Sequence, residues 1–258
     1  MTPSPLWSET TGPPDAPLVV LVHGSMDRSA GLLKLARRLD DDHRVLRYDR
    51  RGYGRSTPHA GPFDLGSQVD DLASMLDGRA AIVFGHSYGG NVALALADRR
   101  PELVRAVAVY ESPLSWLEWW PTSTAGGDAL AVRDGHVADP ADAAERFMRR
   151  LVGDERWSRL PERTRRARRE EGQAMVGELR DLRDHPPWDP AAVTMPVVAM
   201  RGEHGAEHHR RSTAHLAATL PDCRVVDIHG ARHFGPNTHP DAVGAVITDL
   251  VTRLPSDL

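Results

Sequence analysis

A serine stands at the centre of the run GHSYG, residues 85–89. Apolar residues 80–84 precede this run, and residues 91–99 follow it with helical spacing. The order is strand, tight turn and helix, and glycines flank the serine because side chains there would collide with the strand and the helix. Ser87 is then raised above the sheet at a helix N-terminus, where partial positive charge stabilises an anion. The pattern predicts that Ser87 is a nucleophile.

A serine hydroxyl is a poor nucleophile at neutral pH and needs an adjacent base, for which histidine has a suitable pKa. Thirteen histidines compete for that role. His233 follows the last expected strand, in a loop before the last helix, which is the position that a base needs. His239 is expected at the start of that helix, and His86 cannot easily turn its ring back on Ser87. We therefore predict that His233 is the general base.

Four further histidines lie close together in the sequence: His204, His208, His209 and His215. His204 and His208 have the i, i+4 spacing of two metal ligands, but the glutamate of an H-E-x-x-H motif is missing between them. A solvated loop and helix start is the favoured interpretation. Cys223 is the single cysteine, which excludes an intramolecular disulfide and a cysteine-based zinc cluster. We predict no metal and no organic cofactor.

Apolar runs and helical patterns alternate along the chain. Strands are expected at residues 18–22, 44–48, 80–84, 103–110, 196–200 and 224–228, and helices at residues 29–39, 65–76, 91–99, 207–220 and 241–254. This alternation predicts an α/β fold with a mostly parallel, doubly wound sheet. The length of 258 residues suits one large domain of this kind.

Residues 112–188 interrupt the alternation, because they show no strand pattern and contain two charged helical runs, at about 141–151 and 163–183. An insertion that leaves the carboxyl end of a strand lies over the ligand crevice of such a sheet. We predict that residues 112–188 form a helical cap and that residues 1–111 and 189–258 form the core domain. The alternative is a surface excursion that does not contact the site.

Three tryptophans, Trp116, Trp119 and Trp120, begin this insertion. At helical spacing they share one face, and large aromatic surfaces beside a catalytic centre suit an apolar or aromatic substrate. We predict that they bind substrate, together with Met26, and that charged substrates are poor. The alternative is that the tryptophans only pack the cap onto the core.

The formal net charge of −4 gives no basic character that would indicate a nucleic-acid partner. No apolar run approaches the roughly 18 to 20 residues of a membrane span, and the N-terminus lacks the pattern of a signal peptide. A soluble cytoplasmic enzyme with a small-molecule partner is expected, and the sequence leaves the oligomeric state open.

Four motifs occur in a characteristic order: HG at 23–24, DRRGYGRS at 49–56, the turn around Ser87, and GARHF at 230–234. With them the chain resembles the α/β-hydrolase fold superfamily. The resemblance implies hydrolysis by a serine nucleophile, a histidine base and a carboxylate, in the chain order Ser, acid, His. It also implies a structural role for His23 and an oxyanion hole built from the backbone N–H groups of Tyr88 and Ser25.

The position of the acid departs from the common pattern. Most relatives place an aspartate three residues after the glycine that follows the penultimate strand, and here Gly205 occupies that position. Some α/β hydrolases carry the acid after the strand that follows the nucleophile's helix, and Glu111 matches that place, with Ser112 and Pro113 ending the strand. We predict Glu111 as the acid. Glu203 is the alternative, and Glu111 would then only form a salt bridge or cap the insertion.

The predicted function is hydrolysis of a carboxylic ester or lactone through an acyl-enzyme on Ser87, with a small apolar or aromatic ester-like substrate. The same three residues also suit the hydrolysis of a carbon–carbon bond in a diketone-like compound. A noncatalytic ligand-binding member of the fold is a third hypothesis, because the glycine at position 205 removes the acid from its usual place.

Overall fold

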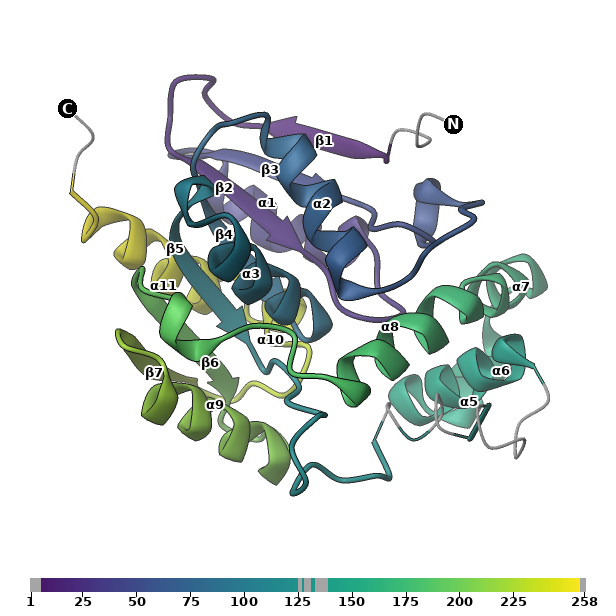
Figure 1. Cartoon of the computed structure of the whole chain (residues 1–258). Coiled ribbons are helices and arrows are strands. Elements are labelled where there is room, and N and C mark those ends of the chain that lie inside the picture. The colour runs from purple at the N-terminus through teal and green to yellow at the C-terminus, as the bar shows by residue number, and fades with distance from the viewer. Residues whose placement is uncertain (1–5, 125–126, 128–130, 133–138, 256–258) are drawn as a thin grey trace.

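Seven strands form a single sheet in the order β1-β3-β2-β4-β5-β6-β7 (Figure 1). The structure is a computed structural model that describes residues 6–124, 127, 131–132 and 139–255. The strands are β1 (Ser8–Thr11), β2 (Leu18–Val22), β3 (Arg44–Tyr48), β4 (Ala81–His86), β5 (Val104–Tyr110), β6 (Val197–Gly202) and β7 (Cys223–Ile228). Only β1 is antiparallel to its neighbour, β3, and every other pair is parallel. The α/β fold with a mostly parallel sheet is confirmed.

The central strands β2 and β4 are buried at every residue because helices cover both faces of the sheet. Helices α2 (Leu65–Leu76), α3 (Tyr88–Arg99) and α9 (Glu207–Thr219) contribute apolar side chains to one core cluster. Helices α1 (Leu33–Leu39) and α11 (Pro240–Thr252) contribute to a second cluster on the opposite face. The short helix α10 (Gly235–Thr238) precedes α11. In the part of the chain that the structure describes, no helix is long and apolar enough to cross a membrane.

Two local differences from the sequence expectation have simple reasons. The expected helix at 29–39 begins with a 3₁₀ turn, Ser29–Leu32, before α1. The edge strand β1 was not expected, because its sequence SETT is polar and largely exposed and therefore lacks the apolar pattern of a buried strand.

The insertion between β5 and β6 contributes the helices α5 (Pro140–Val152), α6 (Asp154–Arg159), α7 (Glu162–Glu170) and α8 (Gly172–Asp184), which we call the cap helices (Figure 1). The expected helical run at 163–183 consists of two helices, because the helix is interrupted at Glu171 between α7 and α8. A Cβ atom on Gly172 would lie 2.2 Å from the carbonyl oxygen of Pro140, so this break brings α8 close to the start of α5. Residues 112–124 form turns rather than a helix.

Candidate active site

Ser87 occupies the turn between β4 and α3, with a φ of 52° and a ψ of −124°. This backbone conformation is strained for a residue other than glycine. A Cβ atom on Gly85 would lie 2.3 Å from the carbonyl oxygen of Gly89, and one on Gly89 would lie 2.3 Å from that of Val22. The flanking glycines are therefore required by close backbone contacts. They hold Ser87 at the carboxyl edge of the sheet, as the sequence predicted.

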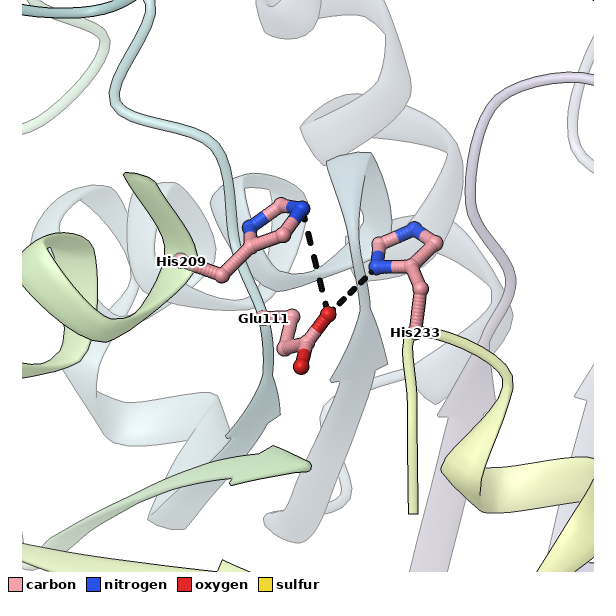
Figure 2. Close-up of side chains that lie close together, drawn as sticks. All are labelled: Glu111, His209 and His233. Atoms are coloured by element: carbon pink, nitrogen blue, oxygen red, sulfur yellow. Dashed lines mark hydrogen bonds and ion pairs between the residues drawn. The ribbon is translucent and has the colours of Figure 1, made fainter. Parts of the chain in front are cut away.

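Glu111 follows β5 at the same edge, and its side chain is fully buried. Its Oε2 accepts a hydrogen bond of 2.7 Å from Nδ1 of His233 (Figure 2). Its Oε1 accepts a second one of 2.9 Å from the N–H of Gly202. Glu111 also has a positive φ of 47°. Two hydrogen bonds and a strained backbone together fix the carboxylate against the imidazole.

Gly205 has a physical explanation in this arrangement. A Cβ atom at this position would lie 2.3 Å from Oε1 of Glu111, so the carboxylate fills the space that a side chain at 205 would need. Glu203, the alternative acid, instead pairs with His229 at 2.7 Å and accepts a hydrogen bond from the N–H of Gly230. That backbone hydrogen bond lowers the pKa of Glu203. The structure therefore brings Glu111, and not Glu203, to the predicted base.

His233 lies in the loop between β7 and α10. Its carbonyl oxygen accepts a hydrogen bond of 2.8 Å from Nε2 of His86, and the hydroxyl of Tyr110 donates to the carbonyl oxygen of Arg232 at 2.8 Å. Burial and the nearby His233 lower the pKa of His86 to about 3, so this neighbour stays neutral. Two contacts from the ends of β4 and β5 thus hold the loop that carries the base.

His209 is a fourth side chain of the site, beside Glu111 and His233, and the sequence did not predict its place there. It lies on the first turn of α9, and its ring stacks on that of His233 with a centroid distance of 4.8 Å and an angle of 14°. Its Nε2 is 3.8 Å from Oε2 of Glu111 (Figure 2). Burial, together with the nearby His233 and His208, lowers its pKa well below the ordinary value. The local histidine cluster was the only sequence signal for it.

The hydroxyl of Ser87 forms no hydrogen bond within the described residues, so the hydrogen bond between Ser87 and His233 is not formed in this structure. Both residues nevertheless border the same two cavities. Catalytic hydrogen bonds are often long without substrate and tighten when substrate binds. The nucleophile and the base thus border the same reaction space.

An oxyanion hole needs backbone N–H groups that are free to donate to the substrate oxygen. The N–H groups of Ser25 and Tyr88 donate to no backbone or side-chain acceptor in the part of the chain that the structure describes. Tyr88 is the first residue of α3, and Ser25 borders both cavities beside Ser87. A Cβ atom on Gly24 would lie 3.0 Å from Cβ of Ser87, which brings the Ser25 loop against the nucleophile.

The two cavities that meet at Ser87 differ in size. The larger has a volume of about 570 Å³ and the smaller about 180 Å³. Ser25 and His233 border both of them, as do Phe147 and Leu151 of the cap helix α5. The insertion therefore does form part of the wall above Ser87.

The predicted substrate-binding residues separate into two groups. Met26 borders the smaller cavity and Trp120 borders the larger one. Trp116 and Trp119 border neither cavity, which corrects the sequence expectation. Because residues 112–124 form turns, the three rings do not share one helix face. Trp116 packs edge-on against Trp188, with 5.6 Å between the ring centroids. The guanidinium carbon of Arg211 lies 4.3 Å from the centroid of the Trp119 ring.

The larger cavity is not purely apolar. Arg150 of α5 and Arg232, beside the base, border it together with Ser115 and Thr124. Within the described residues, no Asp or Glu borders this cavity. Its charged groups are therefore cationic, which the sequence did not predict.

A buried ion pair joins the insertion to the loop that carries Ser25. Arg50 donates to both carboxylate oxygens of Glu178 on α8, at 2.6 and 3.3 Å, and both side chains are fully buried. The same guanidinium donates to the carbonyl oxygens of His23 and Gly24, at 2.9 and 3.1 Å. The N–H of Arg50 donates to Nε2 of His23 at 2.9 Å. Arg50 thus ties the cap helices to the candidate oxyanion loop.

Comparison with known proteins agrees with this fold. Residues 19–246 match the model of the alpha/beta hydrolase family, and the chain belongs to that family. It is 28% identical over 256 residues to 2-(acetamidomethylene)succinate hydrolase of Mesorhizobium japonicum, covering 91% of this chain and 88% of that protein. It is 27% identical over 282 residues to rhodomycin D methylesterase of Streptomyces peucetius, covering 94% and 93%.

Solved structures share the fold. An enol-lactonase from Burkholderia xenovorans superposes with a TM-score of 0.72, covers 96% of both chains and is 24% identical. A thermophilic esterase from Thermogutta terrifontis gives a TM-score of 0.74, covers 96% of this chain and 93% of its own, and is 23% identical. The proteins named here are hydrolases, and this chain shares their fold.

Proposed function

We propose that this protein is a serine hydrolase that cleaves a carboxylic ester or a lactone through an acyl-enzyme on Ser87, with His233 as base and Glu111 as acid. The observation that carries the proposal is the 2.7 Å hydrogen bond between Glu111 and His233, beside a cavity that Ser87 also borders. A serine on a strained turn, a histidine and a buried carboxylate are the three groups that acyl transfer needs.

The reaction follows from the roles of these atoms. Nε2 of His233 accepts the hydroxyl proton as Oγ of Ser87 attacks the substrate carbonyl carbon. Glu111 holds the imidazole in the tautomer that has its proton on Nδ1 and stabilises the imidazolium that forms. The imidazolium then gives its proton to the leaving alcohol oxygen. Water repeats the sequence on the acyl-enzyme, releasing the carboxylic acid and regenerating Ser87.

Negative charge develops on the carbonyl oxygen in both steps. The free N–H groups of Ser25 and Tyr88 would bind that oxygen, and the N-terminus of α3 adds its partial positive charge. Groups that are fixed before the reaction need no reorganisation during it, and removing one such donor typically slows an enzyme by about 10² to 10³. The ties from Arg50 to the Ser25 loop support that fixed geometry.

The cavities suggest the shape of the substrate. One limb of the ester would fill the 180 Å³ cavity, and the other would occupy the 570 Å³ cavity beside Trp120 and Phe147. Because a water molecule takes about 30 Å³ of liquid volume, the smaller cavity suits a limb of roughly six heavy atoms. The rhodomycin D methylesterase relative, which is named for an esterase activity, supports the cleavage of an ester.

Labelling with a fluorophosphonate tests the nucleophile. The wild type should be labelled, and Ser87→Ala should not be labelled and should lose about 10⁴-fold or more in kcat without unfolding. Circular dichroism checks the fold of the variant. Ester hydrolysis at the wild-type rate by Ser87→Ala would refute the proposed nucleophile.

A substrate panel tests the bond type. p-Nitrophenyl esters of increasing chain length should be turned over, with lactones, amides and a carbon–carbon diketone substrate measured beside them. Preferential cleavage of the diketone would replace ester hydrolysis by carbon–carbon hydrolysis. Binding of these compounds without turnover or labelling would favour a noncatalytic ligand-binding protein.

A further inference from the structure

Three side chains that offer metal ligands converge at one point of the active site: Glu111, His209 and His233 (Figure 2). Their ligand atoms, Oε2 of Glu111, Nε2 of His209 and Nδ1 of His233, all lie within 4.8 Å of one another. The carboxylate oxygen is 2.7 Å from the His233 nitrogen and 3.8 Å from the His209 nitrogen. They come from the end of β5, the start of α9 and the loop after β7, so the fold itself assembles the cluster.

The chemistry of this donor set favours Zn²⁺. Two imidazole nitrogens and one carboxylate oxygen are a common set of protein ligands for a zinc site that keeps a fourth position open. Tetrahedral coordination with bonds of about 2.0 to 2.2 Å puts neighbouring ligand atoms about 3.3 to 3.5 Å apart. The rings of His209 and His233 are stacked at an angle of 14°, so zinc binding would turn them out of this stack to bring both nitrogen lone pairs to the ion. The fourth position would face the larger cavity, which His209 and His233 both border.

His209 has properties that suit a ligand and that the hydrolytic reaction does not use. Only 9% of the residue is exposed, and its Nδ1 is buried without a hydrogen-bond partner among the described residues. The Nε2 atom of the same ring lies 3.8 Å from Oε2 of Glu111, so the side chain is already directed at the cluster.

We propose that Glu111, His209 and His233 bind Zn²⁺ and that the bound ion reversibly inhibits the enzyme. Zinc takes the lone pair of Nδ1 on His233, so the single proton of the neutral ring moves to Nε2. With that proton in place, Nε2 cannot accept the proton of Ser87. The ion also occupies the carboxylate oxygen that stabilises the imidazolium. The metal here is an inhibitor and not a cofactor.

Direct binding tests the site independently of catalysis. Isothermal titration calorimetry with ZnCl₂ should show one ion bound to the wild type and to Ser87→Ala with equal affinity. His209→Phe keeps an aromatic ring for the stack on His233 and removes the ligand, and the dissociation constant should rise about a hundredfold. His204→Phe is the matched control, because His204 borders the same cavity but offers no atom to the cluster. This control should change the constant less than twofold.

Inhibition assays test the proposed effect of bound zinc on hydrolysis, which rests on the proposed hydrolase function. Hydrolysis of p-nitrophenyl acetate should fall with Zn²⁺ and recover with EDTA, and each variant is compared with its own metal-free rate. His209→Phe should need about a hundredfold more Zn²⁺ for half inhibition. His209→Gln is a second variant in case the first fails to fold by circular dichroism. Absence of zinc binding to the wild type, or equal zinc affinity in folded His209 variants, would overturn the metal site. Binding without inhibition would overturn the inhibitory role alone.

Discussion

Glu111 and Glu178 are both fully buried glutamates, but one lies at the carboxyl edge of the sheet and the other in the cap helices. Glu111 is hydrogen-bonded to His233, whose charge changes during a proton transfer. Glu178 accepts two hydrogen bonds from Arg50 and one of 2.6 Å from the hydroxyl of Tyr53. Its main partner is therefore a guanidinium that is permanently charged.

This difference in partners separates a catalytic role for Glu111 from a structural role for Glu178. Burial alone would lower the pKa of Arg50, but the Glu178 carboxylate outweighs burial and raises it, so Arg50 stays ionised at every working pH. At the sheet edge, the partners of Glu111 are imidazoles and a backbone N–H, and an imidazole can gain or lose a proton near neutral pH. A buried carboxylate with a titratable partner suits catalysis, whereas one with a fixed partner suits the docking of two segments.

Among the changes that test this comparison of the two glutamates, Glu111→Gln should have the largest effect. Glutamine keeps the shape but loses the charge that stabilises the imidazolium and selects its tautomer, so kcat should fall about 10³- to 10⁴-fold. Glu203→Gln should change kcat less than threefold, because Glu203 contacts His229 and Gly230 instead. Steady-state kinetics on a p-nitrophenyl ester measures both. A larger loss in Glu203→Gln would reject the assignment of Glu111.

Gly205 offers a second test of the same assignment. Gly205→Asp alone should be inactive or unstable, because its Cβ would lie 2.3 Å from the Glu111 carboxylate. The double variant Glu111→Ala with Gly205→Asp should recover at least tenfold in kcat over Glu111→Ala, since the aspartate then enters the vacated space beside His233. No recovery in a folded double variant would mean that the space at 205 cannot hold an acid in this chain.

Residues of the site differ in how far the sequence could predict them. Ser87 lies in a local motif whose turn geometry depends on adjacent residues, and Glu111 and His233 follow strand ends that must meet at one sheet edge. His209 could not be assigned, because its position depends on the rotation of α9 about its axis. The pairing of Arg50 with Glu178, 128 residues apart, is one of many possible pairs in a chain with 32 cationic and 36 acidic residues.

The insertion was the least predictable region for the same reason. Its helical character is visible in the spacing of apolar residues, but the close approach of Gly172 to Pro140, at the break between α7 and α8, is a tertiary contact. The tryptophans were misplaced because helical spacing was assumed where Pro113 and Pro121 bound a series of turns.

Glu178→Gln should mainly affect stability. It leaves the buried Arg50 without its countercharge, and breaking a buried pair in this way costs about 3 to 5 kcal/mol in the free energy of unfolding. Urea unfolding followed by fluorescence measures it. Glu155→Gln is the matched control on the cap helices, because the Glu155–Arg159 pair is exposed and should contribute nothing measurable. Equal stability of both variants would refute the anchoring role of Glu178.

The tryptophans should separate substrate selection from packing. Trp120 borders the larger cavity, so Trp120→Ala should change the relative kcat/KM of long and short esters by about thirtyfold, or about 2 kcal/mol of lost apolar contact. Trp116 packs on Trp188 and borders neither cavity, so Trp116→Ala should lower the melting temperature and keep the wild-type ranking of esters. The reverse result would return Trp116 to the substrate pocket.

The last expected effect is the pH dependence of stability at the sheet edge. Burial lowers the pKa of His86 to about 3 in the folded state, whereas the unfolded chain has the ordinary value of about 6.5. Below pH 6.5 the unfolded state therefore binds the proton and the folded state does not, so stability is lost as the pH falls. Between pH 7.5 and 5.5 this residue alone should remove about 1.4 kcal/mol from the free energy of unfolding.

His86→Gln retains a side-chain N–H donor for the His233 carbonyl and removes the titration, so the variant should lose about 1.4 kcal/mol less than the wild type over that range. Urea unfolding at the two pH values measures both proteins, with Glu178→Gln as a comparison that should keep the wild-type pH dependence, because its Arg50 partner does not titrate there. An identical pH dependence in wild type and His86→Gln would show that the proton is taken up elsewhere.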